Sequence, residues 1–183
     1  MNTAIIIIDM LEDFFRDGPL LDIRSELTAQ INRLTRWGRA KNLPVIWIRQ
    51  AFKEDLSDAY LVMRKNNIHI TIEGTQGCQV LDELDKSVDD YEIVKKRYSA
   101  FFGTTLDDLL ERLNVNTLIL AGINTHACVR TTAIDAYQRD LEIMMPHECI
   151  ASYDAEHHAI TLQYLDKRIA SIVSLPEVLV LTT

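Results

Sequence analysis

Three reactive side chains each come at the end of a segment that is typical of a strand. Asp9 ends an apolar run near the N-terminus, and Lys95 or Lys96 ends a second strand-like segment. Cys128 follows a third such segment and a short turn that contains a glycine. In open parallel sheets, ligands bind outside the carboxyl ends of the strands. We therefore expect a carboxylate, an ammonium group and a thiol to meet at one edge of a sheet.

Together these groups are suited to nucleophilic catalysis. Cys128 is expected near the start of a helix over residues 126–139, where unpaired N–H groups favour an anion, so its thiolate is expected to form more readily than in a free cysteine. Asp9 would accept the thiol proton, and a lysine ammonium would stabilise both anions. Each residue alone has an ordinary explanation, because free cysteines are usually buried apolar residues and lysines are usually solvated. Their coincidence at strand ends indicates a catalytic cysteine.

The elements that must position these groups alternate between strands and helices. Strands are predicted over residues 4–8, 44–49, 91–95, 117–121, 142–145 and 171–174, and helices over residues 25–41, 104–113, 126–139 and 155–169. Such alternation predicts one α/β domain over residues 1–183, with a mostly parallel sheet covered by helices on both faces. Ser25 is the predicted N-cap of the first helix. Residues 50–76 are polar and irregular, and we expect this long loop near the site.

Composition and charge limit the classes of partner. The chain has 48% hydrophobic and 25% charged residues and a net charge of −8, so a nucleic acid is not an expected partner. Its three cysteines lie far apart, which predicts reduced thiols instead of disulfides. The sequence has neither a basic leader nor a run of about 18 apolar residues. We therefore expect a cytoplasmic protein that does not bind membranes and that acts on a small molecule.

Three separated motifs resemble those of one enzyme family. The first is Ile6–Met10 with Asp13 and Phe14, the second is Lys95–Phe101 with Gly103 and Thr104, and the third is Gly122–Val129 with Thr132, Ala133, Asp135 and Ala136. In order and content these motifs are similar to those of the isochorismatase-like cysteine hydrolases, which include nicotinamidases and N-carbamoylsarcosine amidases. The resemblance implies a three-layer α/β/α fold with a six-stranded Rossmann-like sheet. It also implies a homo-oligomer, either a dimer or a tetramer.

The resemblance assigns roles to particular residues. The family's Asp, Lys and Cys triad falls on Asp9, Lys95 and Cys128 in this chain. Lys96 is a rival for the middle role, but the family's lysine usually stands three positions before an aromatic residue, which in this chain is Tyr98. Alternation along a strand allows only one of the two lysines to face the thiol.

The turn before the cysteine is also typical of the family. In the family this turn carries a cis peptide bond, which in this chain would fall between Ile123 and Asn124. The resemblance implies an oxyanion hole made by the backbone N–H groups of Asn124 and Cys128.

The sequence departs from the nicotinamidases at their metal site. Those enzymes bind a metal through an Asp-x-His motif after the second strand, whereas residues 49–55 of this chain contain no histidine. Neither a G-x-G-x-x-G motif nor a Walker loop follows a predicted strand, so neither a metal nor a cofactor is expected. His157 and His158 are neighbours on a helix and cannot both face one ion, and His158 is predicted to be structural.

Aromatic and polar side chains near the strand ends are the predicted pocket residues. They are Phe14, Arg49, Gln50, Tyr98 and Phe101, with Trp47 and Phe102 as further candidates. For each of them, an ordinary place in the core or on the surface is the alternative interpretation. Cys78 is a further candidate for the pocket, although a buried structural role is favoured, and Cys149 is predicted to lie in the core.

These residues predict a hydrolase that cleaves an amide or ureido C–N bond of a small molecule through a thioester on Cys128. One alternative is vinyl-ether hydrolysis of an isochorismate-type substrate, since the Arg97–Phe101 pattern is shared with those enzymes. A protein that keeps the fold for binding, without catalysis, is a second alternative. The presence of all three triad residues favours the first interpretation.

Overall fold

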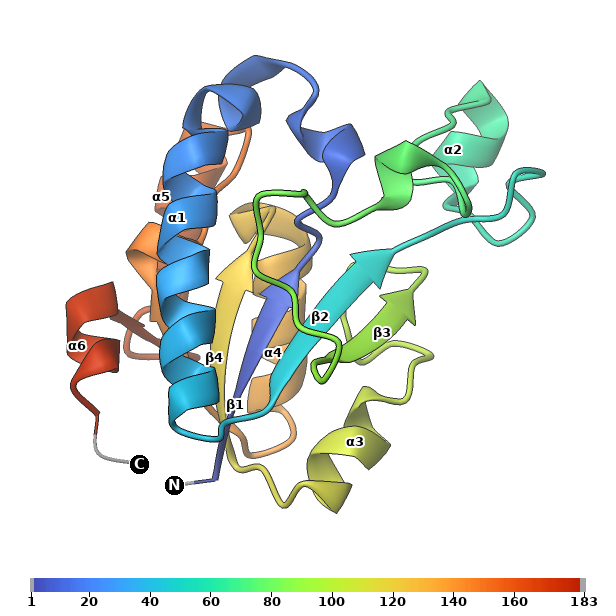
Figure 1. The fold of residues 1–183 in the computed structure, drawn as a ribbon. Coiled ribbons are helices and arrows are strands. Elements are labelled where there is room, and N and C mark those ends of the chain that lie inside the picture. The colour runs from blue at the N-terminus through green and yellow to red at the C-terminus, as the bar shows by residue number, and fades with distance from the viewer. Residues whose placement is uncertain (1, 182–183) are drawn as a thin grey trace.

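The structure, a computed structural model, describes residues 2–181 and is built around one six-stranded sheet (Figure 1). All strand pairings are parallel, and the strand order is β3-β2-β1-β4-β5-β6. The strands are β1 (Thr3–Ile8), β2 (Val45–Gln50), β3 (Tyr91–Lys95), β4 (Thr117–Gly122), β5 (Glu142–Pro146) and β6 (Ser171–Val173). The predicted α/β fold class is confirmed, and the sheet is parallel throughout.

The strand β1 forms the centre of the sheet because its side chains are apolar on both faces. Ile6 and Ile8 pack into one cluster of buried side chains, and Ile5 and Ile7 pack into a second cluster on the other face. This division follows from the two-residue alternation of a strand. Continuous β-branched runs of this kind are typical of parallel strands that are covered on both sides.

Helices cover both faces of the sheet and complete three layers. They are α1 (Gly18–Ala40), α2 (Leu61–Asn66), α3 (Leu106–Arg112), α4 (Arg130–Tyr137), α5 (Ala155–Leu165) and α6 (Leu175–Leu179). The helices α1 and α6 pack on the face that contains Ile5, whereas α3, α4 and α5 pack on the face that contains Ile6. None of the helices in residues 2–181 has the length and apolar character that crossing a membrane requires.

The first helix begins earlier than predicted. It starts at Gly18 instead of Ser25, with Asp17 in the N-cap position and Pro19 in the first turn. Proline is favoured in the first helical turn because its missing N–H would have no partner there. The prediction placed the start too late because it used only the apolar positions from Leu27 onward and left out Leu20, which lies two turns earlier and is also buried.

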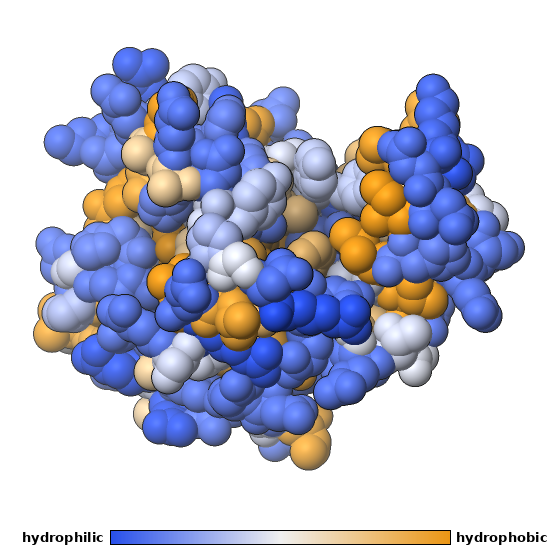
Figure 2. Space-filling model, turned by 90° about the horizontal axis from the view of Figure 1, so that it is seen from above, coloured by the Kyte–Doolittle hydropathy of each residue, from blue (hydrophilic) through white to orange (hydrophobic). Residues whose placement is uncertain are grey.

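The chain between β2 and β3 forms a projection that we call the lobe, residues 52–72. The lobe contains α2 and has its own small core, which includes Phe52, Met63 and Ile72. It extends past the carboxyl end of β2 (Figure 1). In the view from above, apolar side chains of this projection face the hollow that separates it from the body of the molecule (Figure 2). A helix within this predicted irregular loop was not anticipated from the sequence.

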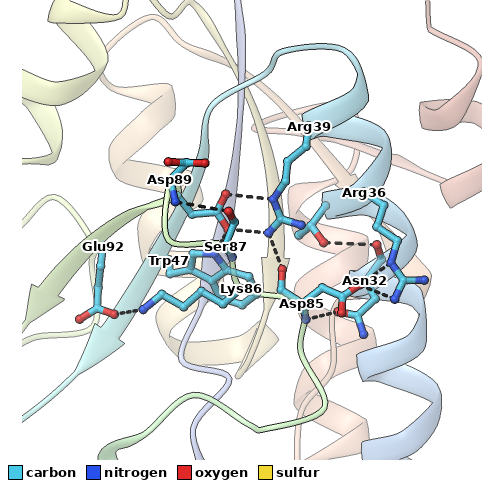
Figure 3. Close-up of polar contacts among 11 residues, drawn as sticks. Asn32, Arg36, Arg39, Trp47, Asp85, Lys86, Ser87, Asp89 and Glu92 are labelled. Carbon is cyan, nitrogen blue, oxygen red and sulfur yellow. Dashed lines mark hydrogen bonds and ion pairs between the residues drawn. The ribbon is translucent and has the colours of Figure 1, made fainter.

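A polar network attaches the segment before β3 to the rest of the molecule (Figure 3). The Asp90 carboxylate accepts hydrogen bonds from Arg39 Nε at 3.0 Å and from Trp47 Nε1 at 2.9 Å. The backbone N–H of Asp85 donates to Asn32 Oδ1 at 2.8 Å, and Asp85 also pairs with Arg36. These contacts link α1 and β2 to the segment that leads into β3. They therefore help to fix the strand that ends at Lys95.

Candidate active site

Asp9, Lys95 and Cys128 come together at the carboxyl edge of the sheet. Lys95 Nζ lies 2.7 Å from Asp9 Oδ2 and 3.3 Å from Cys128 Sγ. The exposed fractions of the three residues are 1% for Asp9, 0% for Lys95 and 6% for Cys128. Asp9 follows β1 and Cys128 follows β4, and these neighbouring strands lie where the strand order reverses. Crevices for ligands form at such positions in open parallel sheets.

The backbone around Asp9 fixes the direction of its carboxylate. Asp9 leaves β1 in the left-handed region, with φ of 53°, and its N–H donates to Ile48 O at 2.9 Å. Its Oδ1 accepts a hydrogen bond from the Gln50 N–H at 3.0 Å. Its Oδ2 contacts Lys95 and has no other polar partner among residues 2–181. Oδ2 therefore keeps a lone pair that can accept a proton.

The two neighbouring lysines point in opposite directions. Lys95 is fully buried and faces the thiol, whereas Lys96 pairs with Asp58 Oδ2 at 2.8 Å. Lys96 Nζ also donates to the carbonyl oxygen of Ala51. The structure thus brings Lys95, and not its rival, to Cys128. The second lysine attaches the lobe to the end of β3.

Cys128 lies in a wide helical turn, Thr125–Val129, before α4. The peptide bond between Ile123 and Asn124 is cis, as the resemblance implies. Gly122 begins the turn with φ of 107°, and a Cβ at this position would lie 2.1 Å from Ile8 O. Only glycine allows so close an approach of the two strands. The predicted helix over residues 126–139 is therefore replaced by this turn and the shorter α4.

His158 holds the same turn from outside. Thr125 Oγ1 donates to Ala151 O at 2.9 Å and lies 3.0 Å from His158 Nδ1. Burial and the neighbouring His126 lower the pKa of His158, which leaves its ring neutral near pH 7. These contacts are those of a structural histidine.

The proposed oxyanion donors are both at the cavity wall. Asn124 and Cys128 line the cavity described below. The Asn124 N–H has no hydrogen-bond acceptor among the residues that the structure describes. A free N–H in the wall of the same cavity as the sulfur can bind a developing oxyanion. The role of this pair stays a prediction.

The electrostatic surroundings keep the proton on sulfur. Burial raises the pKa of the Cys128 thiol above its ordinary value, and the Asp9 carboxylate raises it further against the opposing effect of Lys95. Burial alone would lower the pKa of Lys95, but Asp9 and Cys128 raise it above its ordinary value. The prediction that the thiolate forms more readily than in a free cysteine is therefore wrong. The loss of water around sulfur outweighs the attraction of the turn and the ammonium group.

A cavity with a volume of about 600 Å³ opens between the strand ends and the lobe. It is lined by Asp9, Phe14, Gln50, Tyr60, Val62, Met63, Ile68, Ile70, Tyr98, Asn124, His126, Ala127, Cys128, Arg130, Thr131 and Tyr153. Its walls are mainly aliphatic and aromatic, and its polar groups gather around Cys128. Pockets of this size and character bind small molecules.

Three of the five predicted pocket residues line this cavity, and two do not. Phe14, Gln50 and Tyr98 belong to its wall. Arg49 points to the opposite side of β2 from Gln50, where its Nη1 lies 2.8 Å from Cys78 Sγ and its Nη2 lies 3.0 Å from Glu92. Phe101 is in the core on the α4 side of the sheet. These two predictions were wrong because proximity to a strand end does not specify a face.

The further candidates also lie outside the cavity. Trp47 is buried in the core and bonded to Asp90, whereas Phe102 is 66% exposed. Cys78 is buried beside Arg49, and burial raises the pKa of its thiol. Cys149 belongs to the core, and burial raises the pKa of its thiol to about 12.

Several residues of the cavity wall were not predicted. His126 lies two positions before Cys128 and Arg130 lies two positions after it, so their short distance in sequence from Cys128 was a usable signal. The Arg130 guanidinium lies 4.9 Å from the Tyr164 ring centroid and has no ion-pair partner among residues 2–181. Tyr60 comes from the lobe, and its contribution depends on how that loop folds.

The histidines do not form a metal cluster. Within residues 2–181, no group of three or more His, Cys, Asp or Glu side chains is arranged to hold a metal ion. His126 contacts Ser152, and His157 Nδ1 lies 2.8 Å from Asp154 Oδ2. One ring nitrogen of each of these two histidines, Nδ1, is thus directed to a protein partner.

Comparison with known proteins identifies the family. The family model described as the isochorismatase domain matches residues 3–177. The chain is 34% identical to a probable inactive nicotinamidase of Arabidopsis thaliana, over 76% of the chain and 74% of that protein. It is 29% identical to enterobactin synthase component B of Escherichia coli, over 97% of the chain but only 62% of that longer protein.

A solved structure gives the same result. The pyrazinamidase/nicotinamidase of Streptococcus mutans superposes with a TM-score of 0.82 at 27% identity, over 93% of this chain and 99% of that one. The chain therefore belongs to the isochorismatase family of hydrolases. The family resemblance of the three sequence motifs is confirmed.

Proposed function

We propose that this protein is a cysteine hydrolase that cleaves an amide or ureido C–N bond of a small molecule. The observation that carries the proposal is the position of Lys95 Nζ, 2.7 Å from Asp9 Oδ2 and 3.3 Å from Cys128 Sγ. A thiol, a carboxylate and an ammonium group in contact provide a nucleophile, a base and a charge that holds the two together. The adjoining cavity can accept the substrate.

The first half of the reaction forms a thioester. Asp9 Oδ2 takes the proton of Cys128 as the sulfur attacks the carbonyl carbon. The backbone N–H groups of Asn124 and Cys128 donate to the resulting oxyanion. The C–N bond then breaks, Asp9 returns the proton to the leaving nitrogen, and ammonia or an amine departs.

The second half of the reaction restores the thiol. Asp9 takes a proton from water, and the hydroxide attacks the thioester carbonyl. The C–S bond breaks, the acid product leaves, and the proton passes from Asp9 to sulfur. Lys95 stays charged throughout because its pKa is raised above the ordinary value. It keeps the carboxylate directed at the sulfur in both halves.

The raised pKa of Cys128 is compatible with this sequence of steps. A thiol that keeps its proton needs a base at the moment of attack, and Oδ2 of Asp9 has a lone pair for that purpose. Proton removal is then coupled to carbon–sulfur bond formation. The buried thiol is also protected from oxidation between turnovers, because the thiolate is the reactive form.

We also propose the type of partner, the cellular location and the oligomeric state of this protein. The partner would be a small molecule instead of a nucleic acid, since the net charge is −8 and the cavity has a volume of about 600 Å³. We also propose a cytoplasmic protein that forms a dimer or a tetramer, as the resemblance implies. Size-exclusion chromatography with light scattering measures that state directly.

Ammonia release tests the proposed reaction. The purified protein is offered nicotinamide, benzamide, N-carbamoylglycine and succinamic acid, and the acyl-enzyme is trapped by acid quenching and found by intact mass. We expect ammonia from at least one compound. We also expect an acyl adduct in the intact mass of the wild type that is absent from Cys128→Ala. Ammonia release that persists in Cys128→Ala would contradict the proposal.

Vinyl-ether hydrolysis is the second candidate, because the matching family model carries the name of isochorismatase. This reaction does not require an acyl transfer to sulfur. Isochorismate is therefore included as a separate arm of the assay. Its cleavage by both the wild type and Cys128→Ala, without ammonia release from any amide, would favour this candidate.

A further inference from the structure

The lobe contributes an unusual polar group to the cavity. Tyr60 lies in the N-cap position of α2, and its side chain lines the same cavity as Cys128 and Asn124. Its hydroxyl oxygen is buried and has no hydrogen-bond partner among residues 2–181. Buried polar groups in proteins are rarely left without a partner, and a buried tyrosine hydroxyl usually finds one.

Aromatic packing holds Tyr60 in this position. Its ring centroid lies 5.6 Å from that of Phe52 in an edge-to-face arrangement and 5.2 Å from that of Tyr98. The Arg97 guanidinium lies 5.3 Å from the ring centroid. Rotation of the whole Tyr60 side chain, which would bring its hydroxyl into water, would break these three ring contacts. The phenol is therefore kept at the cavity wall, although its oxygen makes no hydrogen bond there within residues 2–181.

The protonation state of the Tyr60 hydroxyl determines whether it can donate a hydrogen bond. Burial raises the pKa of the Tyr60 hydroxyl, the nearby Cys128, Tyr98 and Asp9 raise it further, and Arg97 opposes them. The phenol thus keeps its proton at physiological pH and is available as a hydrogen-bond donor. The other residues that the lobe contributes to the cavity wall, Val62, Met63, Ile68 and Ile70, are apolar.

We propose that Tyr60 is a substrate-binding residue whose hydroxyl donates a hydrogen bond to an oxygen or nitrogen acceptor of the bound molecule. This inference rests on the proposed hydrolase function and adds a requirement to it. The preferred substrate is an amide or ureide whose apolar part carries a hydrogen-bond acceptor in addition to the carbonyl that reacts. The lobe then selects the substrate, whereas the strand ends carry out the reaction.

The variant Tyr60→Phe separates binding from structural support, because it removes only the hydroxyl and keeps the ring. We expect KM to rise about 3- to 10-fold while kcat stays within about twofold of the wild type. This is the result of losing one neutral hydrogen bond that is equally strong in the bound substrate and in the transition state. The same variant should melt about 2 to 4 °C higher, since an unpaired buried oxygen has been removed. A residue with a merely structural role would not show these opposite changes.

The measurement uses the best-hydrolysed compound among nicotinamide, N-carbamoylglycine and succinamic acid, because each has a hydrogen-bond acceptor besides the carbonyl that reacts. Tyr137→Phe is the matched control, because Tyr137 is 50% exposed on α4 and lies outside this cavity. Its KM and melting temperature should equal those of the wild type. An unchanged KM in Tyr60→Phe would overturn the assignment of Tyr60 and leave the hydrolase function standing. Failure of the wild type to hydrolyse any of the four compounds would overturn the proposed function and this inference together.

Discussion

The Lys95 ammonium and the Asp9 carboxylate form an ion pair of 2.7 Å that is sealed from solvent on both sides. Two charges of opposite sign that have lost their water depend on each other, and removal of one leaves the other unpaired. The chemistry proposed for Cys128 and the stability of the sheet edge are therefore linked.

Asp9→Asn should lower the free energy of unfolding by about 3 to 5 kcal/mol, because Lys95 would stay buried without its partner. Activity should be lost as well, since an amide cannot accept the thiol proton. The double variant Asp9→Asn, Lys95→Met removes both charges and should recover much of the stability without any activity. Urea denaturation of the two single variants and the double variant measures the coupling. Additive effects would show that the ion pair is not the cause.

Cys128→Ala should reduce ammonia release by at least about 10³-fold, because the nucleophile is absent. Cys128→Ser should retain little activity, since a serine hydroxyl is far less acidic than a thiol. Both variants should keep the far-ultraviolet circular dichroism spectrum of the wild type. Cys149→Ala is the control for a buried thiol outside the cavity, and its specific activity should be unchanged.

Alkaline pH should destabilise the protein through its buried thiols. Burial raises the pKa of Cys78, Cys128 and Cys149, whereas the same thiols in the unfolded chain ionise near about pH 8.5. Above that pH the unfolded state binds fewer protons than the native state, so the free energy of unfolding falls as pH rises. The slope is at most about 1.4 kcal/mol per pH unit for each thiol.

Urea titrations at several pH values between about 8 and 10 measure this slope. Cys149→Ala should show a slope that is smaller by the share of one thiol, even though its overall stability is lower. A free energy of unfolding that does not change over this range would contradict the assignment of raised pKa values.

Asp90→Ala should destabilise the protein by about 2 to 3 kcal/mol, because it removes the acceptor of the Trp47 N–H and of Arg39 Nε and leaves Arg39 with only the Asp85 carbonyl oxygen as an acceptor in the described part of the chain. Arg39 and Trp47 also lower the pKa of Asp90 against the effect of burial, so the wild type should lose this stabilisation as pH falls through that lowered pKa. Thermal unfolding measured from neutral to acidic pH tests both statements. Asp89→Ala, at an exposed neighbouring position, is the control and should have little effect.

Arg130→Gln should weaken binding of carboxylate-bearing substrates. Its guanidinium lines the cavity without an ion-pair partner among residues 2–181, so an anionic substrate group would find an available cation there. We expect KM for succinamic acid to rise about tenfold, as for a partly exposed charged hydrogen bond, and KM for benzamide to stay the same. Equal changes for both compounds would point to a loss of packing on Tyr164 instead.

Sequence patterns predicted the sheet and the meeting of Asp9, Lys95 and Cys128 at its edge, because both depend on strand geometry. The isoleucine run before Asp9 predicted a strand buried on both faces, and alternation predicted that only one of Lys95 and Lys96 faces the thiol. The parallel arrangement placed the strand ends together. The start of the first helix was missed because the apolar pattern was followed only from Leu27, although Pro19 and the buried Leu20 already belong to the helix.

The cavity wall was less predictable because it depends on how loops fold. Arg49 and Gln50 are adjacent at a strand end, yet only Gln50 lines the cavity, and the pattern of the strand did not show which face the cavity occupies. Tyr60 contributes through the lobe, whose small core forms from residues with no clear periodicity. The pKa of Cys128 was also misjudged, because the extent of burial decides it and sequence alone does not reveal burial.

Lys95 and Lys96 are consecutive residues that serve separate tasks. The first holds the reacting groups, and the second holds Ala51 and Asp58 at the base of the lobe. A chain built in this way can exchange residues at the far side of its lobe without moving the sulfur. Under the proposed function, substitutions in the lobe would therefore change which molecule binds, while the nucleophile keeps its place.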